Sequence, residues 1–200
     1  MPSAAIVPAA GKGERFGAAK LLADVHGAPM LERTLRALLE GGIDDVIVVL
    51  AVESEVTRRR SAVAALGEPR VRIVVNPDPA RGMFSSIQCG LHDVRPASRA
   101  ILVLPGDMPF VRPGTVTAVL AAARGSAEPI SPTHNGRRGH PLALPSCARA
   151  ALLAADPRGS LDDVLRLLSL PRREVPVDDA GILRDVDTAA DLSTAATPRR

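Results

Sequence analysis

The chain has 200 residues, of which 46% are hydrophobic and 24% are charged, and its formal net charge at pH 7 is +3. These values predict a globular, soluble domain that can bury a sizeable hydrophobic core. The arginines are scattered and aromatic residues make up 2% of the chain, which argues against a nucleic-acid partner. No stretch reaches the length of a membrane span, and the first residues lack the features of a signal peptide, so we expect a cytoplasmic protein with no membrane partner.

Strand-like and helix-like patterns alternate along the first 125 residues. The predicted elements in chain order are a strand at 4–9, a loop at 11–20, a helix at 30–39, a strand at 45–50, a helix at 54–66, a strand at 71–75, a helix from 82 to 91, a strand at 100–105 and a helix at 114–123. Later come strands at 129–131 and 142–144, helices at 148–154 and 161–168, and a short strand pair at 173–176 and 183–186.

This alternation is typical of an α/β fold with a doubly wound, mostly parallel sheet. The near-absence of aromatic residues fits a core of alanine, valine, leucine and isoleucine, as in a parallel sheet covered by helices. No linker or internal repeat divides the chain. We therefore expect a single domain over residues 1–200, with a mixed extension after residue 125 and the last ~8 residues frayed.

Both lysines of the chain, Lys12 and Lys20, lie in one glycine-rich segment directly after the first predicted strand. Lysine is a compact charge on a flexible stem, which suits it to reach a phosphate. Gly11, Gly13 and Gly17 allow backbone N–H groups to approach an anion closely. The segment is therefore predicted to be a phosphate-binding loop.

Two polar residues follow other predicted strands, Asn76 after the third and Asp107 after the strand at 100–105. Ligands of doubly wound sheets bind beyond the carboxyl ends of the strands. We therefore expect the glycine-rich loop, Asn76 and Asp107 to share one cleft.

The loop does not fit the two commonest phosphate-binding motifs. It lacks the glycine spacing of a P-loop followed by Lys and Ser or Thr. The third glycine of a dinucleotide fingerprint is one position late, at Gly17, and Glu53 comes only after the second strand has ended.

Five ordered segments instead resemble the MobA-like NTP transferases, and most closely their molybdenum cofactor cytidylyltransferases. The segments are 7–22 with its Pro-Ala-Ala-Gly loop, 76–87, 104–110 with Pro-Gly-Asp-Met-Pro, 138–141 with Arg-Gly-His-Pro, and 185–188 with Asp-Val-Asp-Thr. The resemblance covers about residues 4–192. It implies a three-layer Rossmann-like fold of the nucleotide-diphospho-sugar transferase type.

The resemblance also implies an activity. A member of this family would transfer CMP from CTP to the terminal phosphate of a molybdopterin-type molybdenum cofactor, with Mg²⁺ as its metal and pyrophosphate as the second product. The partners implied are CTP or another NTP, the phosphorylated acceptor, and a molybdoenzyme or its chaperone downstream. The Pro-Ala-Ala-Gly and Pro-Gly-Asp-Met-Pro forms favour CTP over GTP, by analogy alone.

Residue roles follow from the resemblance, position by position. Lys20, Arg15 and Asp107 would be catalytic, and Asp107 and Asp187 would bind the metal. The nucleotide would contact Pro8, Ala9, Ala10, Gly11, Lys12, Gly13, Arg15, Lys20, Asn76, Ser85 and Ser86. The acceptor would contact Asn135, Arg138 and His140.

Simpler interpretations stay open for several of these residues. Lys12 is equally well explained as a solvated side chain, and Asp187 and Ser85 as helix caps. His140, beside Pro141, is as well suited to ordering the chain as to touching substrate. For the whole protein, the alternatives are a sugar-phosphate or methylerythritol-phosphate nucleotidyltransferase and a non-catalytic chaperone that binds the molybdenum cofactor.

Overall fold

The computed structural model describes residues 2–11, 20–52, 60, 63–64, 66–188 and 191. The predicted frayed tail, most of the glycine-rich loop and most of the predicted helix at 54–66 lie outside these residues. Within the described ranges, no helix is both long enough and apolar enough to cross a membrane.

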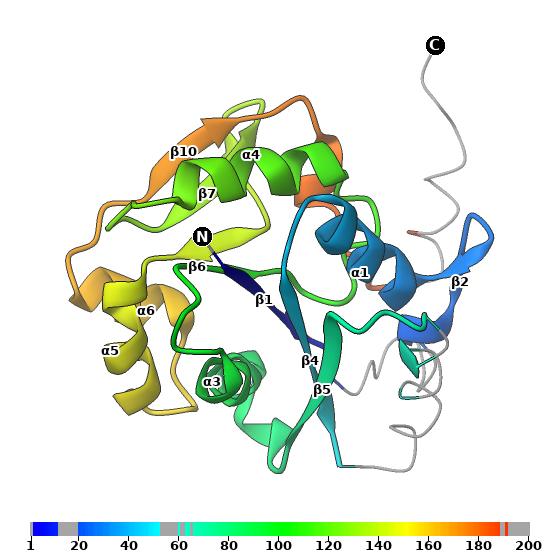
Figure 1. The fold of residues 1–200 in the computed structure, drawn as a ribbon, viewed down its shortest axis with the longest axis horizontal. Helices are drawn as coiled ribbons and strands as arrows, with labels where there is room; N and C mark the ends of the chain where they lie inside the picture. Colours follow the sequence, from blue (N-terminus) through cyan, green and yellow to red (C-terminus); the bar gives the residue numbers. More distant parts are fainter. Residues whose placement is uncertain are drawn as a thin grey trace.

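A mostly parallel sheet forms the centre of the molecule (Figure 1). Its strand order is β10-β7-β9-β6-β1-β4-β5, and the short strand β8 pairs with β7. The strands are β1 (Ser3–Pro8), β4 (Asp45–Ala51), β5 (Val71–Asn76), β6 (Ala100–Val103), β7 (Ile130–His134), β8 (Arg137–Arg138), β9 (Leu142–Leu144) and β10 (Arg173–Pro176). Strand β9 runs antiparallel to β6 and β7, whereas β1 is parallel to both of its neighbours. This confirms the predicted doubly wound class.

Helices cover both faces of the sheet, so that the domain has three layers (Figure 1). One face carries α1 (Met30–Glu40) and α4 (Pro113–Ala123), and the other carries α3 (Met83–Asp93), α5 (Arg149–Ala154) and α6 (Leu161–Leu167). Alternate residues of β1 enter opposite cores: Val7 packs with α1 and α4, and Ile6 with α3. The period-2 alternation of a strand thus fills two cores at once.

Two close helix contacts depend on glycine. A Cβ placed on Gly90 of α3 would lie 2.5 Å from Cγ2 of Ile6, so α3 packs directly on β1. A Cβ on Gly41, at the end of α1, would lie 2.5 Å from Cβ of Val116 in α4. The first contact bears on function because α3 carries residues predicted to line the nucleotide site.

The predicted strand at 183–186 is wrong. Leu183 instead ends a 3₁₀ turn that begins at Ala180, residues 184–186 belong to no strand, and β10 pairs in parallel with β7. The turn begins at Asp179, whose side chain accepts a hydrogen bond from the backbone N–H of Gly181. A local side-chain bond of this kind competes with strand pairing, and the apolar pattern alone does not reveal it.

Two hairpins also escaped the sequence analysis. The polar stretch after β7 turns at Asn135 and Gly136, which both have positive φ, and returns as β8. Near the first helix, β2 (Asp24–Val25) pairs with β3 (Ala28–Pro29) around His26 and Gly27, which also have positive φ. Asn-Gly is a frequent tight turn between antiparallel strands, because both of its central residues tolerate positive φ.

Candidate active site

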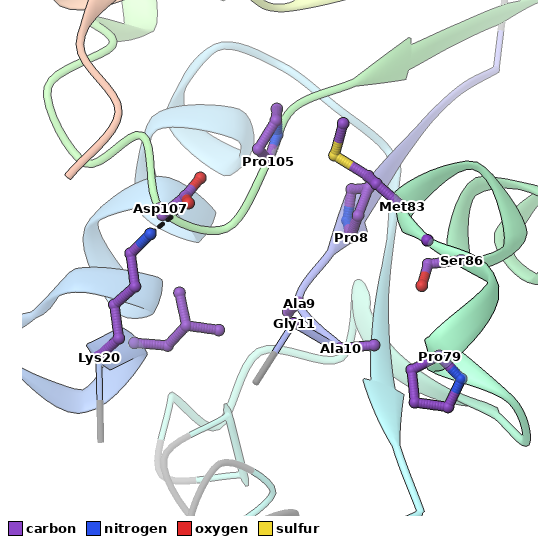
Figure 2. Close-up of a pocket in the computed structure, with 12 residues that line it drawn as sticks. Pro8, Ala9, Ala10, Gly11, Lys20, Pro79, Met83, Ser86, Pro105 and Asp107 are labelled. Carbon is purple, nitrogen blue, oxygen red and sulfur yellow. Dashed lines mark hydrogen bonds and ion pairs between the residues drawn. The ribbon is translucent and has the colours of Figure 1, made fainter. Parts of the chain in front are cut away.

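A pocket of about 230 Å³ opens where β1 and β6 end and α3 begins. Its wall includes the start of the glycine-rich loop, and Figure 2 shows Lys20 with Asp107 on one side and Met83, Ser86 and Pro79 on the other. The described lining residues are Pro8, Ala9, Ala10, Gly11, Lys20, Leu21, Pro79, Gly82, Met83, Ser86, Pro105 and Asp107. The pocket therefore lies at the carboxyl ends of parallel strands, where the sequence placed the cleft.

The ammonium group of Lys20 joins two carboxylates. Nζ donates hydrogen bonds to Oδ2 of Asp107 and to Oδ1 of Asp187, each at 2.8 Å. The Lys20 side chain is 11% exposed, whereas the side chains of Asp107 and Asp187 are 26% and 53% exposed. The cluster is therefore anchored on a buried cation and opens toward solvent through its carboxylates.

The charge state of Lys20 follows from its surroundings. Burial, the largest single cause, lowers the pKa of the amine, but hydrogen bonds and attraction from Asp107 and Asp187 more than offset it, so the pKa lies above its ordinary value. Lys20 is therefore a fixed positive charge at neutral pH. Among the described residues, the two carboxylates take two of its three N–H donors, and the third can point at an anion.

The turn after β6 fixes the position of Asp107. The N–H of Gly106 donates to the carbonyl of Pro8 at 3.1 Å, and the Gly106 carbonyl accepts from Oγ1 of Thr34, a fully buried residue of α1. The turn is thus tied both to the loop after β1 and to α1. Thr34 is a positioning residue that the sequence analysis missed, because a lone threonine on an apolar helix face carries no signal.

Asp187 reaches the cluster from the far end of the chain. The N–H of Val186 donates to the backbone carbonyl of Asp107 at 3.1 Å, which brings Asp187 beside it. The backbone N–H groups of Asp187 and Thr188 both donate to Oδ2 of Asp191. The side chain of Asp187 is therefore directed to Lys20, while Asp191 serves the local backbone.

Asp107 and Asp187 fit a site for a hard divalent cation. One oxygen of each carboxylate accepts from Nζ of Lys20, and each carboxylate has a second oxygen, while Mg²⁺ commonly takes one or two carboxylates together with waters and substrate phosphates. Within the described ranges, no cluster of three or more histidine, cysteine, aspartate or glutamate residues is suited to hold a metal. Other ligands would then come from water or substrate.

Asn76 forms hydrogen bonds to Ser85 and Ser86, which were predicted together with it to contact the nucleotide. Its Nδ2 donates to Oγ of Ser85 at 2.9 Å and to Oγ of Ser86 at 3.0 Å, and all three side chains are buried. Ser85 also donates to the carbonyl of Gly82, one turn back. Of the three, Ser86 lines the pocket, while Asn76 and Ser85 join the end of β5 to the start of α3.

Two further cavities continue from the pocket on its Met83 side. One, of about 370 Å³, is lined by Asp107 together with Arg138 and His140, so two of the three predicted acceptor residues share a cavity with Asp107. The other, of about 340 Å³, also includes Arg138 and His140 and extends toward α6. Met83 and Pro105 line all three cavities, and neither residue was among the predicted site residues.

The third predicted acceptor residue, Asn135, lies elsewhere. It occupies the tip of the β7–β8 hairpin with φ of 50°, and its side chain contacts the ring of His134. It lines neither cavity that contains Arg138, and its turn conformation alone accounts for an asparagine. Three predicted nucleotide contacts, Lys12, Gly13 and Arg15, lie outside the described residues and stay predictions.

A mostly parallel sheet with a pocket at its strand ends is the architecture of many ligand-binding α/β domains. Residues 5–175 match the family of MobA-like NTP transferase domains. The match covers most of the 200-residue chain, and the chain belongs to this family. The resemblance to the MobA-like NTP transferases, inferred from the sequence segments, is thereby confirmed.

Similar proteins include nucleotide-handling enzymes. The bifunctional protein GlmU of Sorangium cellulosum is 32% identical over 148 residues, which are 68% of this chain and 31% of GlmU. A 2-C-methyl-D-erythritol 4-phosphate cytidylyltransferase of Streptomyces avermitilis is 33% identical over 133 residues, which are 65% of this chain and 53% of that protein. The chain thus spans about a third and about half of the lengths of these two relatives.

A solved structure covers nearly the whole chain. The crystal structure of Rv0371c from Mycobacterium tuberculosis H37Rv has a TM-score of 0.79 and 24% identity, and the match covers 98% of this chain and 97% of that one. A complex of the same protein with manganese matches with a TM-score of 0.75 and 25% identity, over 97% of each chain. These matches confirm the predicted fold class.

Proposed function

We propose that this protein is a Mg²⁺-dependent nucleotidyltransferase that transfers CMP from CTP to the terminal phosphate of a molybdopterin-type molybdenum cofactor and releases pyrophosphate. The observation that carries the proposal is the convergence of Asp107 and Asp187 on Lys20, at the edge of the pocket beyond the ends of β1 and β6. Family membership supports the use of an NTP. The Pro-Ala-Ala-Gly loop and a cytidylyltransferase among the relatives support CTP.

In the proposed reaction, an oxygen of the acceptor phosphate attacks the α-phosphorus of CTP, and the bond to the β-phosphate oxygen breaks. Negative charge grows on the α-phosphate oxygens and on the leaving pyrophosphate. Such a reaction needs positioning and charge stabilisation rather than covalent catalysis. Lys20 supplies a preorganised cation, and its third N–H is the donor for an α-phosphate oxygen.

The carboxylates of Asp107 and Asp187 would hold the divalent ion, which when bound neutralises phosphate charge and helps to hold the phosphates in line. The backbone N–H groups of the loop after Pro8 would bind the phosphates, and Arg15 the β- and γ-phosphates. Ser86 would face the ribose or base from the start of α3. Arg138 and His140 would bind the acceptor from the adjoining cavities.

The experiment that tests this proposal offers several acceptors to the purified protein with CTP or GTP and Mg²⁺, and measures pyrophosphate release. We expect release with CTP and molybdenum cofactor. Release with methylerythritol phosphate or a sugar 1-phosphate alone would assign a different acceptor, which the Streptomyces relative makes the first alternative to examine. Cofactor binding without pyrophosphate from either nucleotide would instead identify a non-catalytic chaperone.

A further inference from the structure

The backbone brings the two carboxylates of the site together. The N–H of Val186 donates to the carbonyl of Asp107 at 3.1 Å, so the segment of Asp187 is held against the turn of Asp107. The N–H of Gly106 donates to the carbonyl of Pro8, also at 3.1 Å, which fixes the other side of that turn. A carboxylate close to another carboxylate is disfavoured in its charged form. The pair therefore needs a counter-ion.

Lys20 is that counter-ion. Its Nζ donates to one oxygen of each carboxylate at 2.8 Å, and Figure 2 shows the contact with Asp107. Among the described residues, no other basic side chain forms an ion pair with Asp107 or Asp187. One ammonium beside two carboxylates leaves a single net negative charge. Each carboxylate has a second oxygen, but a divalent cation bound there would lie beside a like charge, which weakens its binding.

Lys20 can change partners while its backbone stays in place. Residues Lys20–Leu22 form a short 3₁₀ turn, and the carbonyl of Lys20 accepts from the N–H of Ala23 at 3.1 Å. The neighbouring side chain of Leu21 is buried. Beyond this fixed backbone, the Lys20 side chain is a flexible stem that lines the pocket. Rotation of the side chain is therefore enough to turn the ammonium from a carboxylate to an anion in the pocket.

The two ion pairs of Lys20 differ in strength. The side chain of Asp187 is 53% exposed, whereas that of Asp107 is 26% exposed. Water screens an exposed ion pair, so the pair with Asp187 contributes less than the pair with Asp107. An anion that attracts Lys20 would therefore replace Asp187 first.

We infer that Lys20 holds the metal site in a state of low affinity until a nucleotide arrives. Its ammonium competes with a divalent cation for Asp107 and Asp187, and a phosphate of the nucleotide draws it away. Both carboxylates are then free for the metal ion, whose other ligands come from water and phosphate. Metal and nucleotide thus bind cooperatively, and each raises the affinity for the other by the same factor. This inference concerns the regulation of the proposed active site and rests on the proposed function for the presence of a nucleotide there.

The test measures the binding of Mn²⁺ without nucleotide, through the electron paramagnetic resonance signal of free Mn²⁺. It compares the wild type with Lys20→Met, which removes the charge, and with Lys20→Arg, which keeps it. Lys20→Gln is a second neutral variant, and its amide still donates to a carboxylate if Lys20→Met does not fold. Arg36→Met is the surface control, because Arg36 pairs with Glu32 on the exposed side of α1.

The neutral variants should bind Mn²⁺ more tightly than the wild type. We expect about a tenfold gain in affinity for Lys20→Met and Lys20→Gln, within the usual range of coupling between two sites. Lys20→Arg and Arg36→Met should bind Mn²⁺ as the wild type does. Equal or weaker binding by the neutral variants would overturn the inference, because Lys20 would then only hold the carboxylates in place. An equal gain in Lys20→Arg would also overturn it, since charge would not be the cause.

A second measurement tests the link with the nucleotide. Melting temperatures are compared with Mn²⁺ alone, with nucleotide and EDTA, and with both ligands, using CTP or GTP, whichever stabilises the protein more. In the wild type, both ligands together should raise the melting temperature by more than the sum of their separate effects. This excess should be smaller in Lys20→Met, where no ammonium has to be drawn away. An excess of the same size in both proteins would overturn the inference.

Failure of this inference can be distinguished from failure of the proposed function, because the measurement with Mn²⁺ alone contains neither nucleotide nor acceptor. Tighter Mn²⁺ binding by the neutral variants, with no CMP transfer by the wild type to any acceptor, would uphold the inference and overturn the proposed function. CMP transfer to molybdenum cofactor by the wild type, with unchanged Mn²⁺ binding in the neutral variants, would overturn the inference alone.

Discussion

Replacement of Lys20 by methionine tests the role assigned to the buried cation. Methionine has a similar length and no charge, so the change removes the ammonium without opening a large cavity. It also removes the positive charge that separates Asp107 from Asp187, to which Nζ donates at 2.8 Å in both cases. The variant should therefore change both turnover and stability, by amounts that the structure distinguishes.

Turnover should fall by about 10²- to 10³-fold, or roughly 2.7–4 kcal/mol of transition-state stabilisation, as when one preorganised donor is removed from an active site. The cost in stability should be smaller. Loss of one partner from a fully buried ion pair costs about 3–5 kcal/mol, but Asp187 is 53% exposed and Asp107 is 26% exposed. Water screens the two carboxylates, so we expect a loss of about 1–2 kcal/mol.

The assay is steady-state pyrophosphate release with CTP and molybdenum cofactor, combined with urea unfolding of the same samples. Arg36→Met is the control, because Arg36 pairs with Glu32 on the exposed surface of α1 and its side chain is 57% exposed. This control should leave turnover unchanged and cost at most about 0.5 kcal/mol. Turnover of Lys20→Met within threefold of the wild type would refute the phosphate role and leave Lys20 as a structural partner of the carboxylates.

Three other predictions concern the metal, the packing of α3 and the pH dependence of stability. Asp107→Asn should lose most of the rise in melting temperature that Mn²⁺ with CTP gives the wild type, whereas Asp78→Asn, on the exposed surface, should keep it; equal rises would contradict the metal assignment. Gly90→Ala should cost about 1–3 kcal/mol of unfolding free energy, because its Cβ would lie 2.5 Å from a side-chain carbon of Ile6; unchanged unfolding in urea would show that α3 is not packed as described. The pKa of His140 lies below its ordinary value of 6.5 because of burial, so below that pH the unfolded state binds more protons than the folded state. The free energy of unfolding should therefore decrease as the pH is lowered from 6.5, by up to about 1.4 kcal/mol per pH unit; His140→Gln should reduce this slope, and an unchanged slope would mean that other groups cause it.

The sequence predicted the parallel part of the sheet because its signal is local. The apolar runs that became β1, β4 and β6 are uninterrupted, and the run that became β5 is broken only by Arg72. The region after residue 125 was harder, because its strands are short and its turns depend on single side chains. Asp179 caps a 3₁₀ turn that ends at Leu183, where the apolar pattern had predicted the start of a strand.

Prediction of the site depended on motifs rather than on patterns. Lys20 and Asp107 are 87 positions apart, and Asp187 is a further 80 positions along the chain, so no local spacing links them. The family resemblance and the rule that parallel strands end at one edge brought them together in advance. Their mutual distances came only from the structure.

The residues that the sequence did not reveal act through position alone. Thr34 holds the turn before Asp107 by donating a hydrogen bond to the carbonyl of Gly106. A single threonine on a helix has no sequence signature, because its effect depends on a partner that is distant in the chain. Met83 differs, since it lies within segment 76–87, one of the five that carry the family resemblance, and could have been assigned to the pocket from that segment.

The measurement that tests the account most directly follows the label of [α-³²P]CTP after incubation with the protein, Mg²⁺ and molybdenum cofactor. The account predicts that the label moves to the cofactor and that unlabelled pyrophosphate is released in equal amount. It also predicts that neither occurs when Asp107 is replaced by alanine. Label that stays in CTP, or that moves to the cofactor only when GTP replaces CTP as the labelled nucleotide, would contradict the proposed cytidylyl transfer.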